Sequence, residues 1–137
     1  MKIVFDTNIY LASTLFDGLC LNLVEACLGP KSEQEVFISK DIWKEFADKV
    51  IEKRLGDKAY LPILQKSLEK RAIWVEPVEK INIIKDDPAD NKILESAVAA
   101  HADLIITMDK KHLLKLKQFR GIGIVHPINF SYMLPKD

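Results

Sequence analysis

The sequence predicts an α/β fold in which helices cover both faces of a five-stranded parallel sheet. Five short runs are rich in apolar and β-branched residues without polar alternation, which is typical of strands buried on both faces. Segments with helical spacing of apolar residues separate these runs, and strands that alternate with helices form parallel sheets. We expect the strands at residues 2–5, 35–38, 73–75, 104–107 and 122–125.

Length and composition fit one globular domain, which we expect to span residues 1–137. The 20 Lys and Arg residues balance 20 Asp and Glu residues, so the formal net charge is zero and the pI is about 6.8. This balance excludes a wholly basic nucleic-acid-binding domain and leaves only a local patch for such a role. Hydrophobic residues make up 48% of the chain, which excludes disorder for most of it.

The two cysteines, Cys20 and Cys27, lie seven residues apart in a segment that we expect to be helical. At a rise of ~1.5 Å per residue they would be about 10 Å apart, too far for a disulfide. We therefore expect two buried thiols in a reducing compartment and a cytoplasmic protein. No apolar run approaches the ~18 residues of a membrane span, and Asp6 interrupts the first run, so we expect neither a span nor a signal peptide.

Helix start and stop signals separate the predicted strands. Asp6-Thr7-Asn8 marks a helix start, Gly18 breaks the pattern that follows, and Gly29-Pro30 stops a second helix. Ser39 is an N-cap candidate for a third helix. The first expected helix has Ile9, Leu11, Leu15 and Phe16 on its apolar side. Further helices are expected at 19–28, 42–51 (ended by Gly56), 58–70 and 109–117, and one that includes 93–100. We expect an acidic and proline-rich loop at 76–88 and a tail at 127–134 with one helical turn.

Four of the five strands are followed by acidic residues. In an open parallel sheet, ligands bind outside the carboxyl ends of the strands, so these acids should share one edge. The polar residues at that edge are Asp6 and Asn8 after the first strand, Ser39, Asp41 and Glu45 after the second, Asp86, Asp87 and Asp90 after the third, and Thr107 and Asp109 after the fourth.

Each acid taken singly also has a structural explanation. Asp6 and Asp109 could cap helices, Asp87 could be an N-cap with Pro88 at the first helical position, and Glu45 could be an exposed helix acid. These explanations do not account for the grouping at one edge. Crowded carboxylates repel one another unless a cation neutralises them, and oxygen ligands favour Mg²⁺ or Mn²⁺. We do not expect His or Cys to be placed here to form a zinc site.

Four segments in order resemble the motifs of the PIN-domain ribonucleases, within them the toxin-like branch of bacterial and archaeal toxin–antitoxin pairs. The likeness extends from residue 2 to residue 130. The segments are IVFDTN at 3–8, ISKDIWKE at 38–45, DPADNKILESA at 87–97 and ADLIITMD at 102–109, and VHPINF at 125–130 is similar to an ending common in this branch.

The resemblance implies a three-layer α/β/α fold and Mg²⁺- or Mn²⁺-dependent hydrolysis of RNA phosphodiester bonds. It also implies an RNA substrate, a homodimer and a small DNA-binding antitoxin as partner. Carried over by position, the catalytic and metal-binding acids are Asp6, Glu45, Asp90 and Asp109, and the supporting polar residues are Asn8, Thr107 and Asp87.

Other functions fit parts of the pattern. A non-catalytic protein- or RNA-binding module would keep the fold without needing the acids. A haloacid-dehalogenase-type phosphatase needs a second Asp where this chain has Asn8, which cannot deliver a proton. A response-regulator receiver needs a Lys after its fifth strand, where this chain has His126.

Four lysines near the acids in sequence are candidates for contacts with RNA phosphates: Lys40, Lys44, Lys110 and Lys111. Solvated lysines on helix faces would give the same pattern. For His101, His112 and His126 we expect structural roles.

Overall fold

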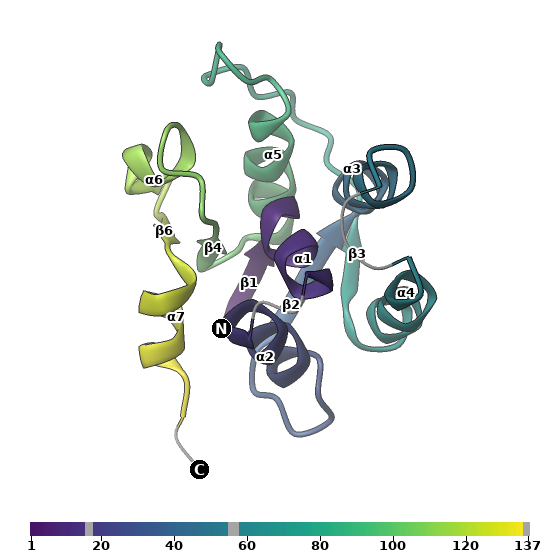
Figure 1. Ribbon diagram of the computed structural model, residues 1–137. Helices are drawn as coiled ribbons and strands as arrows, with labels where there is room; N and C mark the ends of the chain where they lie inside the picture. The colour runs from purple at the N-terminus through teal and green to yellow at the C-terminus, as the bar shows by residue number, and fades with distance from the viewer. Residues whose placement is uncertain (16–17, 55–57, 136–137) are drawn as a thin grey trace.

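A central six-stranded sheet organises the computed structural model, which describes residues 1–15, 18–54 and 58–135 (Figure 1). Phe16 and Gly56 lie outside these ranges. The strand order is β3-β2-β1-β4-β6-β5. Five strands pair in parallel, as predicted: β1 (Lys2–Phe5), β2 (Glu35–Ser39), β3 (Ile73–Val75), β4 (Leu104–Ile106) and β6 (Ile122–Val125).

The sequence-based prediction missed one strand. The two-residue β5 (Gln118–Phe119) pairs antiparallel with β6 at the sheet edge. Arg120 and Gly121 join the two strands with φ values of 52° and 83°, the left-handed pair that a tight hairpin turn needs. Glycine adopts such a φ without strain, so Gly121 permits the turn.

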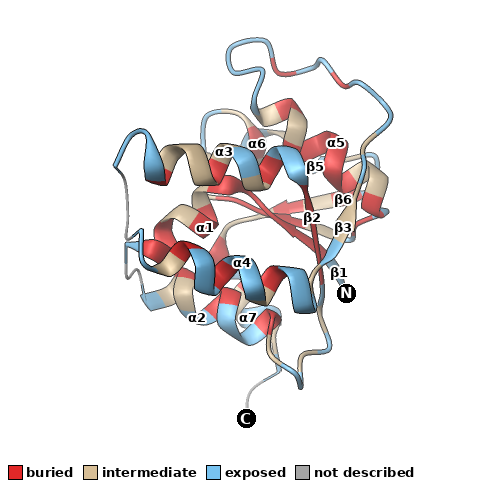
Figure 2. Ribbon diagram, turned by 90° about the vertical axis from the view of Figure 1, so that its right-hand side faces the viewer, coloured by how far each residue is buried: buried red, intermediate tan, exposed pale blue. Residues whose placement is uncertain are grey.

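Helices cover both faces of the sheet (Figure 2). On one face, α5 lies across β1, β2, β3 and β4, while α2, α4 and α7 lie on the other. Ile3, Val4 and Phe5 of β1 are fully buried because helices pack on both sides of this strand. The helices are α1 (Thr7–Thr14), α2 (Gly18–Cys27), α3 (Lys40–Ile51), α4 (Tyr60–Arg71), α5 (Asp90–Ala100), α6 (Leu113–Leu116) and α7 (Pro127–Met133).

Two predicted elements differ in length from the observed ones. The expected helix at 109–117 is only the four-residue α6, because residues 110–112 form a turn on the Asp109 carboxylate. The expected single turn after residue 127 is the seven-residue α7. His126 caps α7, with its Nδ1 accepting a hydrogen bond from the Ile128 N–H at 3.2 Å. Cys20 and Cys27 are buried free thiols, as expected.

The segment between β3 and α5, residues 76–89, forms a strap held by side chains of α5. The buried Asn91 carboxamide accepts hydrogen bonds from the Ile83 and Ile84 N–H groups and donates one to the Ile84 carbonyl, at 2.8–3.2 Å. Glu95 accepts a further bond from the Ile81 N–H at 3.0 Å. The strap therefore meets its backbone hydrogen-bonding needs through side chains and not through the sheet.

Among the described residues, no single helix is long and apolar enough to cross a membrane. By length and composition alone, α1 and α2 together pass as a broken span, but a bend of 113° separates them. Core helices give the same signal.

Candidate metal centre

The candidate site lies at the carboxyl ends of β1 and β4, the two strands at the middle of the sheet. From β1 the chain proceeds outward to β2 and β3 on one side, and β4 and β6 fill the other side. This reversal creates the crevice where open α/β sheets bind ligands. The Asp6 N–H donates to the Ile106 carbonyl at 2.9 Å, which fixes the first acid beside the end of β4.

Asp6 is a buried carboxylate, only 5% exposed. Thr107 Oγ1 donates a hydrogen bond to Asp6 Oδ2 at 2.7 Å. Burial raises the pKa of Asp6 to about 6, and the nearby negative charges of Glu45 and Asp109 add to this rise, while the Thr107 bond opposes it. Asp6 occupies the cap position of α1 but its side chain makes no capping bond, so the capping explanation was wrong.

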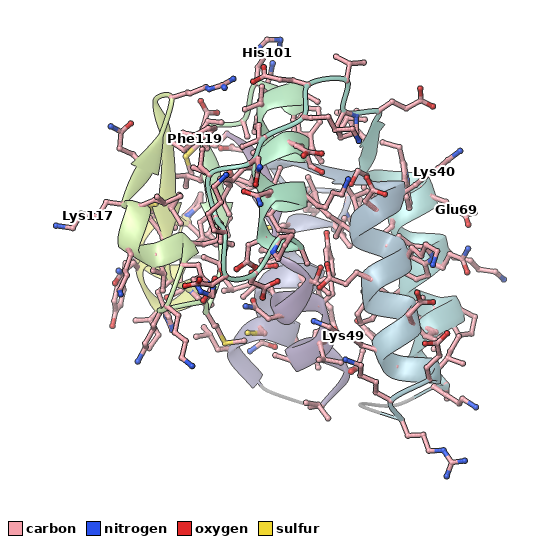
Figure 3. The ribbon with its side chains drawn as sticks, turned by 90° about the horizontal axis from the view of Figure 1, so that it is seen from above. Lys40, Lys49, Glu69, His101, Lys117 and Phe119 are labelled. Carbon is pink, nitrogen blue, oxygen red and sulfur yellow. The ribbon has the colours of Figure 1, made fainter. Side chains whose placement is uncertain are left out.

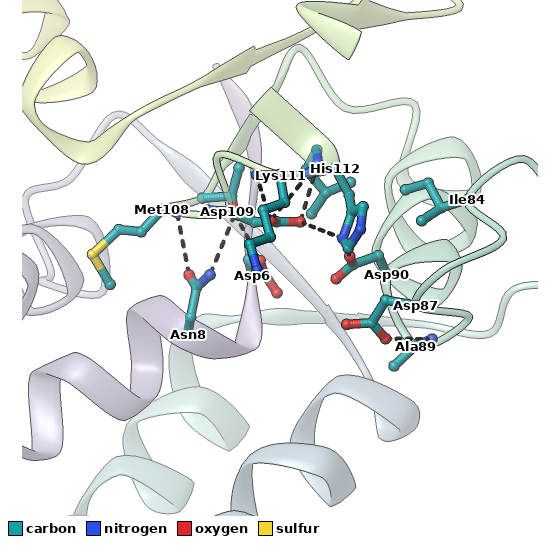
Figure 4. Close-up of polar contacts among 12 residues, drawn as sticks. Asp6, Asn8, Ile84, Asp87, Ala89, Asp90, Met108, Asp109, Lys111 and His112 are labelled. Carbon is teal, nitrogen blue, oxygen red and sulfur yellow. Dashed lines mark hydrogen bonds and ion pairs between the residues drawn. The ribbon is translucent and has the colours of Figure 1, made fainter. Parts of the chain in front are cut away.

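Asn8 and Thr107 connect the two strand ends. Asn8 Nδ2 donates to Thr107 Oγ1 and Asn8 Oδ1 accepts from the Met108 N–H, both at 3.4 Å. Thr107 Oγ1 also accepts from the Asp109 N–H at 2.9 Å. One hydroxyl thus links the backbone of Asp109 to the carboxylate of Asp6. Figure 4 shows the bond between Asn8 and Met108 beside it. The supporting role of Asn8 and Thr107 stays a prediction.

Backbone N–H groups hold Asp109 in place. Its carboxylate accepts bonds from the N–H groups of Lys111, His112 and Leu113 at 3.1–3.2 Å, so it anchors the turn before α6, whose cap position is His112. Partial burial opposes ionisation, but these bonds and a hydrogen bond with Asp90 lower the pKa of Asp109 below its ordinary value. Asp109 is therefore an anion whose position is set by the backbone.

Asp90 is the first residue of α5 and faces Asp109 from across the crevice. Burial raises its pKa, as do the shared hydrogen bond with Asp109 and the charges of Asp109, Asp87 and Asp6. Ala89, not Asp87, occupies the cap position of α5, so the predicted cap was wrong. Asp87 instead accepts a bond from the Ala89 N–H at 3.3 Å.

Glu45 approaches the cluster from α3. Its carboxylate accepts a 3.4 Å hydrogen bond from Thr7 Oγ1 and pairs with Lys49 Nζ at 3.1 Å. The side chain is 29% exposed, so the simple exposed-acid explanation was wrong. Because its charge raises the pKa of Asp6, Glu45 is electrostatically part of the same group of acids.

His112 also lies in this group, contrary to the expectation that no histidine would be placed there. Its Nδ1 is 3.0 Å from Asp90 Oδ2 and 3.7 Å from Asp109 Oδ2 (Figure 4). Ligand atoms of Asp87, Asp90 and His112 lie within 4.8 Å of one another, close enough for one metal ion. The sequence feature that could have indicated this placement of His112 is its position three residues after Asp109, on a tight turn.

The four predicted lysines are distributed unevenly around the acids. Lys110 and Lys111 are exposed on the turn directly after Asp109. Lys40 is exposed at the start of α3, whereas Lys44 pairs with Asp48 at 3.1 Å. Figure 3 labels Lys40 and Lys49 near the two ends of α3. Sequence reasoning missed Lys49, Lys53 and Lys92, which line a groove between α3 and the start of α5 together with Glu45 and Asp87.

Comparison with known proteins agrees with this architecture. A family model described as PIN domain matches residues 2–111. The chain belongs to the PIN domain family. The match confirms both the family and the fold class that the sequence predicted for this PIN-domain protein.

A solved structure has the same fold. It is the crystal structure of VapBC2 from Rickettsia felis bound to a DNA fragment from their promoter. One of its chains is 16% identical in sequence, with a TM-score of 0.59, and the match covers 92% of this chain and 98% of that chain. No curated protein matches the chain in sequence.

Proposed function

We propose that this PIN-domain protein is a metal-dependent endoribonuclease and the toxin of a toxin–antitoxin pair. One observation carries the nuclease proposal: acids from three separate parts of the chain share one crevice. The Thr107 hydroxyl joins the Asp6 carboxylate to the backbone of Asp109, and His112 Nδ1 lies 3.0 Å from Asp90 Oδ2 and 3.7 Å from Asp109 Oδ2. Family membership favours this function over a phosphatase or a receiver, because PIN domains are generally nucleases.

The donor set fits a hard divalent cation. Asp6, Glu45, Asp90 and Asp109 offer carboxylate oxygens, the ligands that Mg²⁺ and Mn²⁺ prefer. Burial, together with the charges of neighbouring acids, raises the pKa of Asp6 and of Asp90, and a bound cation would offset this cost of ionising them. An ion bound here would activate a water molecule as the nucleophile and neutralise charge on the phosphodiester.

The chain's own residues position these groups. The backbone N–H groups of residues 111–113 fix the Asp109 carboxylate, and Thr107 fixes one oxygen of Asp6. Asn8 holds the loop after β4 against the start of α1. Lys110 and Lys111, and Lys49, Lys53 and Lys92 along the groove, would bind RNA phosphates on either side of the scissile bond.

The partners follow from the family and the structural neighbour. Because that neighbour comes from a complex named VapBC2, a small DNA-binding antitoxin is the expected partner of this chain. We further propose a cytoplasmic homodimer. Light scattering on the purified protein tests the dimer. Rescue of growth by the product of an adjacent small gene tests the antitoxin.

Cleavage of structured RNAs in the presence of Mg²⁺ or Mn²⁺ tests the nuclease proposal. The wild type should cleave, EDTA should stop cleavage, and Asp6→Asn should abolish it while the circular dichroism spectrum stays unchanged. Glu69→Gln, which alters an exposed acid on α4, is the matched control and should cleave normally. RNA binding without cleavage under any metal would favour the non-catalytic module instead.

A further inference from the structure

The group formed by Asp87, Asp90 and His112 has a different chemistry from the four acids, because it includes a ring nitrogen. All three candidate ligand atoms lie within 4.8 Å of one another. The residues come from two distant segments, the strap with the start of α5 and the turn before α6. A nitrogen donor changes which metal ion a site prefers.

The backbone around Asp109 presents His112 to the crevice. The His112 N–H donates to Asp109 Oδ1 at 3.2 Å, and the next N–H, of Leu113, donates to Oδ2 at 3.1 Å. The half-buried ring therefore starts from a fixed backbone and points between two carboxylates, with its Nδ1 3.0 Å from Asp90 Oδ2 (Figure 4). Adjacent ligands of one ion, each ~2.1 Å from it, also lie about 3 Å apart.

Asp87 supplies an oxygen on the solvent side of this group. The Asp90 N–H donates to the Asp87 carbonyl at 3.1 Å, and the Ala89 N–H donates to Asp87 Oδ1 at 3.3 Å. These bonds turn the strap so that the carboxylate of Asp87, just before α5, lies close to that of Asp90, the first residue of α5. The exposed position of Asp87 leaves a path by which an ion can enter.

We propose that Asp87, Asp90 and His112 together bind a divalent cation, and that the imidazole makes this position select Mn²⁺ over Mg²⁺. Mg²⁺ keeps oxygen ligands and loses water reluctantly, whereas first-row transition metals accept imidazole nitrogen. The inference rests on the metal-dependent activity proposed above and deepens it. The proposed ligand set shares Asp90 with the four acids, adds Asp87 and a nitrogen ligand, and assigns the ion.

Electron spin echo measurements on the Mn²⁺-loaded full chain test the nitrogen ligand directly. The wild type should show modulation from a directly bound ¹⁴N nucleus. Titrations with each metal should show that His112→Gln lowers the affinity for Mn²⁺ by about tenfold and that for Mg²⁺ by less than about twofold. His126→Gln, at the cap of α7, is the control and should match the wild type. Asp87→Asn should weaken Mn²⁺ binding but keep the nitrogen modulation.

Absence of nitrogen modulation in the wild type would overturn the proposal. So would equal losses of Mn²⁺ and Mg²⁺ affinity in His112→Gln, because His112 would then only orient Asp90. RNA cleavage separates this inference from the proposed function. Cleavage without nitrogen modulation overturns the inference alone. Nitrogen modulation without cleavage under any metal supports the inference and overturns the nuclease proposal.

Discussion

Replacing Asp6 by Asn should stabilise the metal-free protein at pH 8 while abolishing its activity. The folded protein holds Asp6 at a pKa of about 6 against an ordinary value of 3.8, chiefly because the carboxylate is buried. One pH unit is worth about 1.4 kcal/mol, so ionising Asp6 costs the folded state about 3 kcal/mol. Asn is nearly isosteric, removes this charge and can still accept the bond from Thr107.

The sign of the pH dependence follows from the raised pKa. Between pH 4 and pH 6 the folded state binds a proton at Asp6 that the unfolded state has lost, so the free energy of unfolding falls as the pH rises through this window. Wild type in EDTA should therefore lose stability between pH 5 and pH 8, and Asp6→Asn should lose less. At pH 8 the difference should reach up to about 3 kcal/mol, or roughly 10 °C in Tm.

Thermal unfolding followed by circular dichroism tests this prediction. It is measured in EDTA and again with roughly 5–10 mM Mg²⁺, a concentration suited to a site of ordinary affinity. The ion should raise the Tm of the wild type and have little effect on Asp6→Asn. Glu69→Gln, on α4, should follow the wild type throughout. A large loss of metal-free stability in Asp6→Asn at pH 8 would refute the reasoning, because Asp6 would then be a structural acceptor for Thr107.

Three further outcomes can be checked. Asp109→Ala should lose about 1–2 kcal/mol of stability, more than Asp109→Asn, because it removes the acceptor of three backbone N–H groups. Since the pKa of Asp109 is lowered, this loss should be complete above about pH 4 and should shrink only as the pH falls further, through the lowered pKa; urea unfolding at each pH measures it. Asn91→Ala should lower the free energy of unfolding, measured in urea, by about 3 kcal/mol, because the strap loses three buried hydrogen bonds. The control Asn82→Ala, at an exposed position, should change it little. Equal effects of the two substitutions would mean that the strap does not depend on Asn91. Lys110→Ala combined with Lys111→Ala should weaken RNA binding. It should also flatten the slope of log affinity against log salt concentration by about 0.7 per lost phosphate contact. The control pair on α4, Lys66→Ala with Lys70→Ala, should change neither quantity, and unchanged affinity and slope in the first variant would remove Lys110 and Lys111 from the RNA-binding surface.

The parallel strands were predictable because their burial on both faces leaves a local signal. Ile3, Val4 and Phe5 are all apolar, and their burial follows from that composition. The strand β5 left no such signal, since two residues show no periodicity and the strand depends on the turn at Arg120 and Gly121. The helix α6 was overestimated because the Leu114 N–H donates to the Asp109 carbonyl, five residues earlier, and not to the carbonyl four residues earlier that an α-helix would use.

The acids of the site could be proposed from their position after each strand, because parallel strands end at one edge. The contribution of His112 could not be proposed, since its partner Asp90 lies 22 residues earlier on α5. Only the packing of α5 across the sheet brings these residues together. The capping explanations failed for both acids. His112 occupies the cap position of α6, although Asp109 accepts three adjacent N–H groups, and the hydroxyl donor to Asp6 is 101 residues away.

The strap has a consequence for local unfolding. Its amide groups at Ile81, Ile83 and Ile84 are held by side chains of α5, so the strap can open without breaking any bond of the sheet. Opening would remove Asp87 from the crevice, while Asp6 and Asp109 would stay on the central strands. An ion that binds Asp87 and His112 together would therefore oppose this opening and slow hydrogen exchange across residues 76–89. Hydrogen exchange of the strap would then report whether an ion occupies the site.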